Sequence, residues 1–106
     1  MPELIVESGP LAGASFSFDC QVVIGRGELV DVRLDDVTVS RRHAEVRPVL
    51  GTWELVDLGS ANGVLLNDER IAASRPLKDG DRIGVGQIVL RFGSARLLDS
   101  REGLNV

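Results

Sequence analysis

The sequence predicts an all-β fold, a sandwich of short strands, from three observations. Most of the chain divides into short runs in which apolar and polar residues alternate, as they do in half-buried strands. Twelve glycines and four prolines in 106 residues indicate many tight turns. Only the last residues, from Ser94 onward, show even a weak helical period. Short strands separated by glycine-rich turns favour a β-sandwich whose loops gather at its two ends.

The strands predicted in the first half of the chain are alternating runs that stop at turn residues. The apolar run Leu4-Ile5-Val6 stops at Ser8-Gly9-Pro10, which is a turn signal. Pro48 follows the run at 43–47 and places its end at an edge strand or a turn, because proline has no N–H for a sheet ladder. The five predicted strands cover residues 3–7, 16–18, 21–24, 32–34 and 43–47.

Cys20 is the only cysteine, and it lies among apolar residues of the same period-two phase. Phe16, Phe18, Val22 and Ile24 share that phase. We therefore expect Cys20 to be a small hydrophobic residue facing the core, not a reactive thiol.

The second half of the chain continues the same pattern. Asn67-Asp68 predicts a hairpin tip, and Asp79-Gly80 predicts a further turn. The predicted strands cover residues 52–55, 64–66, 70–71, 82–85 and 87–92. We expect one domain at 1–93, followed by a partly disordered C-terminal tail or linker at 94–106. The chain is expected to be the N-terminal module of a longer polypeptide.

Composition excludes several classes of function. The net charge of −4 argues against a non-specific grip on nucleic acid, which needs a basic excess. A single cysteine and a single histidine build neither a disulfide framework nor a zinc site. There is no secretory signal, and no apolar run approaches the roughly 20 residues of a membrane span. These features predict a cytoplasmic protein with no membrane insertion, no metal and no cofactor.

Enzymatic interpretations find little support in the residues. Ser40, His43 and Asp57 supply the residue types of a catalytic triad, but nothing around Ser40 resembles a nucleophile elbow. Gly25-Arg26-Gly27 lacks the third glycine and the following helix of a dinucleotide site. We therefore predict no catalytic residues.

Three loops carry the residue types that bind anions. They contain Gly25-Arg26, the stretch 39–43 with Ser40, Arg41 and His43, and the turn 57–63 with Asn62-Gly63. Loops at one end of a β-sandwich converge, so these three are expected to meet at one rim. Guanidinium, hydroxyl and amide groups from three sides would form a small cup for a phosphate or carboxylate oxygen.

The order of these motifs resembles that of the forkhead-associated (FHA) domain, most closely its bacterial members. The resemblance extends from about Leu4 to Phe92. Each motif alone is weak, and their succession with suitable gaps is what carries the likeness. The motifs are Gly25-Arg26, Ser40-Arg41-x-His43, Trp53-x-Leu55, Asp57-Leu58-Gly59-Ser60-x-Asn62-Gly63, Leu66-Asn67, Ile71, Leu77-x-x-Gly80-Asp81-x-Ile83 and Gly86.

The resemblance implies an eleven-stranded β-sandwich that binds phosphothreonine in an extended segment of a partner protein, downstream of a Ser/Thr protein kinase and without catalysis. By position, Arg26, Ser40 and Arg41 would contact the phosphate, and Asn62 would hold the peptide backbone beside it. His43 would brace one loop against another without touching the ligand. Gly25, Gly59 and Gly63 would shape the loops.

Two positions depart from the family pattern. Ala61 stands where many members have a threonine whose hydroxyl adds a phosphate contact, and Val64 stands where a threonine is common. Thr38, Arg42 and Ala61 are the candidates for selectivity toward residues after the phosphothreonine. The loss of the hydroxyl at Ala61 keeps an alternative open, a phosphate-independent interaction or assembly module that uses an exposed sheet face.

Overall fold

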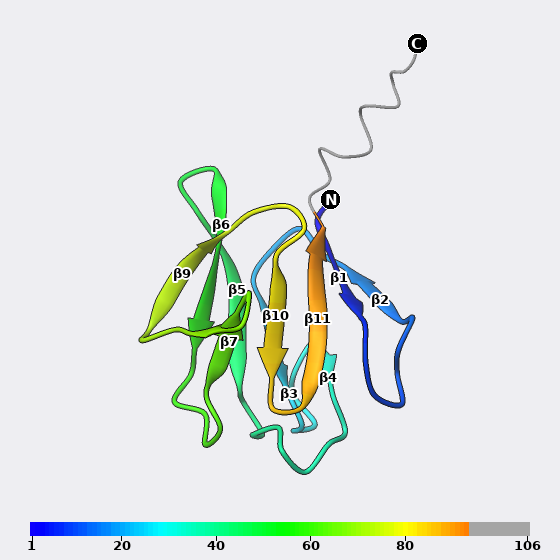
Figure 1. Cartoon of the computed structure of the whole chain (residues 1–106). Coiled ribbons are helices and arrows are strands. Elements are labelled where there is room, and N and C mark those ends of the chain that lie inside the picture. Colours follow the sequence, from blue (N-terminus) through cyan, green and yellow to red (C-terminus); the bar gives the residue numbers. More distant parts are fainter. Residues whose placement is uncertain (94–106) are drawn as a thin grey trace.

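The computed structural model describes residues 1–93, and within this range it contains eleven strands and no helix (Figure 1). The all-β sandwich is therefore confirmed, whereas the predicted tail at 94–106 lies outside the described residues. No helix in residues 1–93 is long and apolar enough to span a bilayer. The strands are β1 Glu3–Val6, β2 Ser15–Ser17, β3 Val22–Gly25, β4 Val32–Arg33, β5 Ala44–Val49, β6 Thr52–Asp57, β7 Val64–Leu66, β8 Glu69–Arg70, β9 Ser74–Leu77, β10 Arg82–Val85 and β11 Ile88–Gly93.

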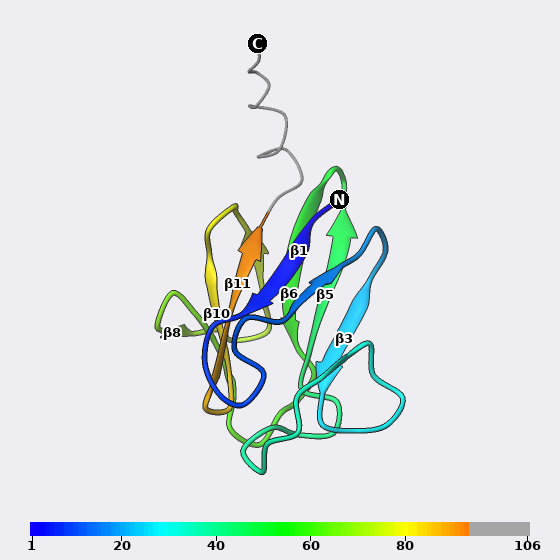
Figure 2. The same ribbon diagram turned by 90° about the vertical axis from the view of Figure 1, so that its right-hand side faces the viewer.

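The strands form two sheets that lie face to face, as the rotated view shows (Figure 2). One sheet has the order β2-β1-β11-β10-β7-β8, and the other has the order β4-β3-β5-β6-β9. The pairing of β1 with β11 joins the first strand to the last, with Glu3 opposite Gly93. The β3–β4 pair is parallel, and every other pair is antiparallel.

Alternation along the strands places one set of side chains between the sheets. Leu55 of β6 and Leu90 of β11 are fully buried. Trp53 is only half buried, but its ring packs edge-on against Phe18, with the two ring centroids 5.1 Å apart. The residues that alternation leaves outside are mostly charged or polar.

The prediction for Cys20 was wrong, because its side chain is exposed. Strand β2 ends at Ser17 and β3 begins at Val22, and the chain bends through Asp19 and Cys20 between them. The period-two phase on either side of this bend is therefore not continuous. In β3, moreover, every residue is buried.

Two strands that contain a proline differ from the prediction. Strand β5 runs through Pro48 to Val49, where it pairs only with β6, since its contact with β3 ends at Val46. Pro48 therefore lacks a neighbour on one side, so no ladder bond is lost there. Strand β9 was not predicted. It contains Pro76, and this proline is tolerated because β9 is the edge of its sheet.

The predicted hairpin tip at Asn67 and Asp68 is confirmed. These residues have φ angles of 51° and 72°, and they connect β7 to β8. Positive φ at both central residues matches the right-handed twist of the flanking strands.

The loops that follow β3, β4, β6 and β10 lie together at one end of the sandwich, the lower end in Figure 1. The loop between β1 and β2 reaches the same end, whereas the N-terminus lies at the other. The three loops singled out in the sequence therefore share one rim.

The exposure of Cys20 can be tested by thiol chemistry. We expect a thiol-specific chromogenic reagent to label native Cys20 at nearly the rate that it labels the chain in denaturant, because no packing shields the sulfur. Cys20→Ser is expected to change the free energy of unfolding by no more than about 0.5 kcal/mol. Protection of the native thiol would mean that Cys20 faces the core.

Candidate functional site

The first two loops of the rim are joined through their main chains. The Arg26 N–H donates to the Ser40 carbonyl at 2.9 Å, and the Gly27 N–H donates to the Arg41 carbonyl at 3.1 Å. A Cβ on Gly25 would lie 2.1 Å from the Arg41 oxygen, so a side chain there would force the two loops apart. Gly25 thus holds Arg26 against the segment that contains Ser40 and Arg41.

The Arg26 side chain is held in place at one nitrogen only. Its Nε donates to the Val39 carbonyl at 2.9 Å, which fixes the plane of the guanidinium. The side chain is exposed, and residues 1–93 supply no other partner to this guanidinium. The two terminal nitrogens are therefore available to the oxygens of an anion.

Ser40 is positioned by hydrogen bonds that leave its hydroxyl proton uncommitted. Its Oγ accepts from the Ala61 N–H at 3.0 Å, across the gap between the second and third loops. Arg41 and Arg42 beside it are exposed and form no ion pair within the described part of the chain. The structure thus brings a hydroxyl donor together with charged groups on one rim.

His43 is fully buried and joins the second loop to the third. Its Nδ1 accepts from the Ser40 N–H at 2.9 Å, so the ring proton belongs on Nε2, which then donates to the Gly63 carbonyl at 2.8 Å. The main chain of His43 also donates to Ile24 and accepts from Leu58. Both ring nitrogens are occupied by backbone groups, so Ser40, His43 and Asp57 do not form a catalytic triad.

Asp57 organises the third loop. Its Oδ1 accepts hydrogen bonds from the Gly59 N–H at 3.1 Å, the Ser60 N–H at 2.9 Å and the Ser60 hydroxyl at 2.9 Å. Burial acts to raise the pKa of the Asp57 carboxyl, but the hydrogen bonds from Ser60 and Gly59 outweigh it, so the pKa is lowered. Gly59 and Gly63 both have φ of 81°, which favours glycine at these two positions.

Asn62 is exposed at the tip of the third loop, and its side-chain amide donates to the Thr38 carbonyl at 2.7 Å. This bond aims the amide group across the rim toward the second loop. Asn62 and Arg26 thus bond the carbonyls of two successive residues of the second loop, Thr38 and Val39.

Thr38 was expected to be a selectivity residue, but its hydroxyl lies within a network of the loop itself. The hydroxyl donates to the Asp36 carboxylate and accepts from the Gln87 N–H at 2.9 Å. The Thr38 N–H also donates to Asp36, and together these bonds lower the pKa of the Asp36 carboxyl. Gly86 lies so close that an added Cβ would be 2.5 Å from the Thr38 hydroxyl.

This network brings in a fourth loop that the sequence interpretation missed. The spacing of Asp36 and Thr38 is typical of an Asx turn and could have indicated the local bond. The contact with Gln87 spans 49 positions, and no local pattern encodes it.

Among residues 1–93, no three His, Cys, Asp or Glu side chains gather in a way that could hold a metal ion.

A sequence model of a known family matches the part of the chain that forms this arrangement. Residues 22–86, which contain the whole cup, match the FHA domain. The chain belongs to the FHA-domain family.

Two relatives of this FHA domain have names that describe regulation. An oxoglutarate dehydrogenase inhibitor from Corynebacterium diphtheriae is 47% identical over 90 residues, which are 84% of this chain and 62% of that protein. The glycogen accumulation regulator GarA from Mycolicibacterium smegmatis is 44% identical over 90 residues, 84% of this chain and 56% of that protein. The chain thus spans about six tenths of the length of these relatives. Both names describe regulation and not catalysis.

A solved structure shares the fold of this FHA domain closely. It comes from a structural and functional analysis of phosphothreonine-dependent FHA domain interactions. It superimposes with a TM-score of 0.79 at 32% identity, over 88% of this chain and 95% of that chain. The likeness extends the family assignment from sequence to architecture.

The depressed pKa of Asp57 predicts an acid-dependent loss of stability. A carboxyl whose folded pKa lies below its ordinary value stabilises the fold above that ordinary value, and the contribution is lost as pH falls through the folded pKa. Urea unfolding at several pH values between about 5 and 2 should therefore show a steeper fall for the native domain than for Asp57→Asn. The lowered pKa of Asp36 is present in both proteins, so its contribution to the pH dependence cancels in the comparison. Parallel slopes would contradict the assignment to Asp57.

Proposed function

We propose that this FHA domain binds a phosphothreonine-containing segment of a partner protein, as a cytoplasmic signalling module downstream of a Ser/Thr protein kinase. The observation that carries the proposal is the Arg26 guanidinium, which is fixed through Nε on Val39 and has its terminal nitrogens free on the rim that also presents the Ser40 hydroxyl. The phosphothreonine-dependent interactions named for the similar structure support the same ligand chemistry.

The donors of the cup match the acceptors of a phosphate. Phosphothreonine has close to two negative charges at neutral pH and three acceptor oxygens. The guanidiniums of Arg26 and Arg41 and the hydroxyl of Ser40 supply three donors of the appropriate kind. Each charge-assisted hydrogen bond contributes about 1.5–3 kcal/mol, so three are in the range of the roughly 8 kcal/mol of a micromolar complex.

The net charge of −4 does not oppose this binding. Exposed charges are screened over about 8–10 Å at physiological ionic strength. The charges close to the cup, and not the net charge of the domain, therefore determine the attraction for a phosphate. Arg26, Arg41 and Arg42 place three positive charges on that rim. Arg42 has no ion pair in residues 1–93, and we assign it to an acidic side chain that follows the phosphothreonine.

Asn62 would hold the peptide main chain. Its amide already bonds a main-chain carbonyl, that of Thr38, at 2.7 Å. The side chain is exposed, so its remaining oxygen and N–H can face an extended peptide that lies across the rim. Asn62 would thereby fix the register of the peptide relative to the phosphate.

Replacing Arg26 tests the proposed function directly. Arg26→Ala should weaken binding of a phosphothreonine peptide by about 10- to 150-fold, which corresponds to one lost charge-assisted bond. Fluorescence anisotropy should be measured with peptides that have phosphothreonine, phosphoserine or threonine at the centre, and we expect phosphothreonine to bind best. Arg82→Ala is the matched control, because Arg82 is exposed at the start of β10, lies outside the three loops of the cup and pairs with Glu7.

A lack of preference for phosphothreonine in the native domain would refute the proposal. If Arg26→Ala also left the capture of partner proteins unchanged, the phosphate-independent interaction module would be favoured instead.

Ala61→Thr should strengthen binding. The Ala61 N–H already bonds the Ser40 Oγ, so a hydroxyl added at this exposed position would lie on the rim next to the proposed phosphate position. One further hydrogen bond to a charged oxygen contributes on the order of 1–2 kcal/mol, or about a 5- to 30-fold gain in affinity. Ala61→Val has a similar shape without the hydroxyl and serves as the control. Equal affinities of the two variants would place Ala61 away from the phosphate.

A further inference from the structure

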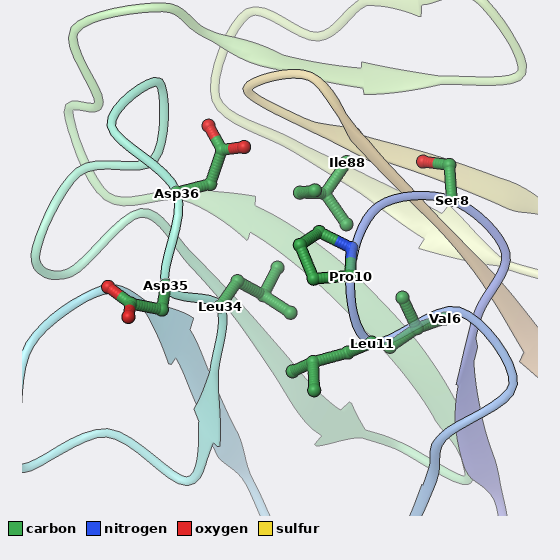
Figure 3. Close-up of a pocket in the computed structure, with 8 residues that line it drawn as sticks. All are labelled: Val6, Ser8, Pro10, Leu11, Leu34, Asp35, Asp36 and Ile88. Carbon is green, nitrogen blue, oxygen red and sulfur yellow. The ribbon is translucent and has the colours of Figure 1, made fainter.

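A small groove opens at the same end of the sandwich as the cup. It has a volume of about 260 Å³ and is lined by Val6, Ser8, Pro10, Leu11, Leu34, Asp35, Asp36 and Ile88 (Figure 3). Pockets for small molecules are typically about 300–1,000 Å³, so this groove is suited to a single side chain. The groove takes no part in the proposed phosphate contacts.

Three segments that are distant in the sequence form the walls of the groove. The loop between β1 and β2 supplies Pro10 and Leu11, the segment after β4 supplies Leu34, and β11 supplies Ile88. Figure 3 shows these apolar side chains directed toward one another. A Cβ on Gly9 would lie 2.6 Å from Ile88 Cδ1, so the absence of a side chain there lets the first loop close against β11.

Asp36 adds a charge at the rim of this apolar groove. One of its oxygens accepts from the N–H and the hydroxyl of Thr38, and these bonds hold the pKa of the carboxyl below its ordinary value. The carboxylate is therefore ionised at neutral pH, and it has no ion-pair partner in the described range 1–93. Asp35 beside it is exposed and adds a second negative charge to this segment.

Hydrogen bonds connect the groove to the peptide-holding side of the cup. Asn62 donates to the Thr38 carbonyl at 2.7 Å, and the Thr38 N–H donates to Asp36 at 2.8 Å. Gln87, which precedes Ile88 in the wall of the groove, donates its N–H to the Thr38 hydroxyl. An extended peptide advances about 3.3 Å per residue, so a peptide held at Asn62 reaches the groove within a few residues.

We propose that this groove binds a lysine or arginine side chain of the same phosphopeptide, with its aliphatic stem on Pro10, Leu11 and Ile88 and its cationic head at Asp36. The assignment rests on the proposed function, because Asn62 must first hold the peptide. Lysine and arginine have this combination of an apolar stem and a charged head. The rim thus presents a positive site for the phosphate and a negative site for a basic residue of one ligand.

The test compares phosphothreonine peptides that have lysine, norleucine, glutamate or alanine at each position up to about five residues on either side of the phosphothreonine. We expect lysine at one position to bind about 5- to 10-fold more tightly than alanine, and more tightly than the uncharged norleucine. This advantage should shrink as salt is raised from about 50 to 500 mM, because the contact with Asp36 is at the rim.

Two variants locate the effect in the groove. Asp36→Asn keeps an oxygen for the Thr38 donors and removes the charge, so it should abolish the lysine advantage and leave the affinity for the alanine peptide unchanged. Leu11→Ser should reduce the same advantage by removing part of the apolar wall. Leu11 is 43% exposed, so this replacement leaves the core intact. Asp19→Asn, at an exposed position between β2 and β3, is the matched control.

Three outcomes would overturn the proposal while phosphothreonine binding stands. Either lysine gives no advantage at any position, or its advantage survives both Asp36→Asn and Leu11→Ser. A norleucine peptide that binds as tightly as the lysine peptide would also overturn it, because the groove would then select apolar side chains alone. If the native domain shows no preference for phosphothreonine, the proposed function is refuted, and this inference with it.

Discussion

The loop end of this domain depends on the buried imidazole of His43. Its two ring nitrogens bond backbone groups of different loops, the Ser40 N–H and the Gly63 carbonyl. A buried main-chain group that lost its partner would cost about 1–3 kcal/mol. The sole histidine of the chain thus has a clear structural role, which is to hold the second loop and the third loop at a fixed separation.

That fixed separation makes an anion site possible on a surface made of loops. Arg26 is held by the close approach of Gly25 to Arg41, and Ser40 is held by both His43 and Ala61. Side chains fixed in this way need little further ordering when a ligand arrives, so less of the binding free energy is lost to conformational entropy. Exposed arginines on unrestrained loops would give the same charge with weaker binding.

The sequence predicts well whatever depends on neighbouring residues. Alternation and turn chemistry locate most strands and the Asn67-Asp68 hairpin, and the succession of motifs brings out the family and its cup residues. Alternation fails at Cys20, because a bend between strands resets the phase, and it fails at β9, because Pro76 is tolerated only at an edge. Edge position is a property of the assembled sheet, and a local pattern cannot report it.

The same limit explains why the hydrogen-bond network of Thr38 and the groove were not predicted. Thr38 looks like a free hydroxyl in the sequence, yet it is the junction of contacts with Asp36, Asn62 and Gln87. Asp36 in turn looks like part of a solvated acidic loop, and the hydrogen bonds from Thr38 distinguish it from Asp35, which also lines the groove. Because Thr38 contacts both the amide that would hold a peptide and the carboxylate at the groove, the phosphate and the basic residue would be recognised at a fixed spacing. Selectivity would then come from that spacing as much as from either charge.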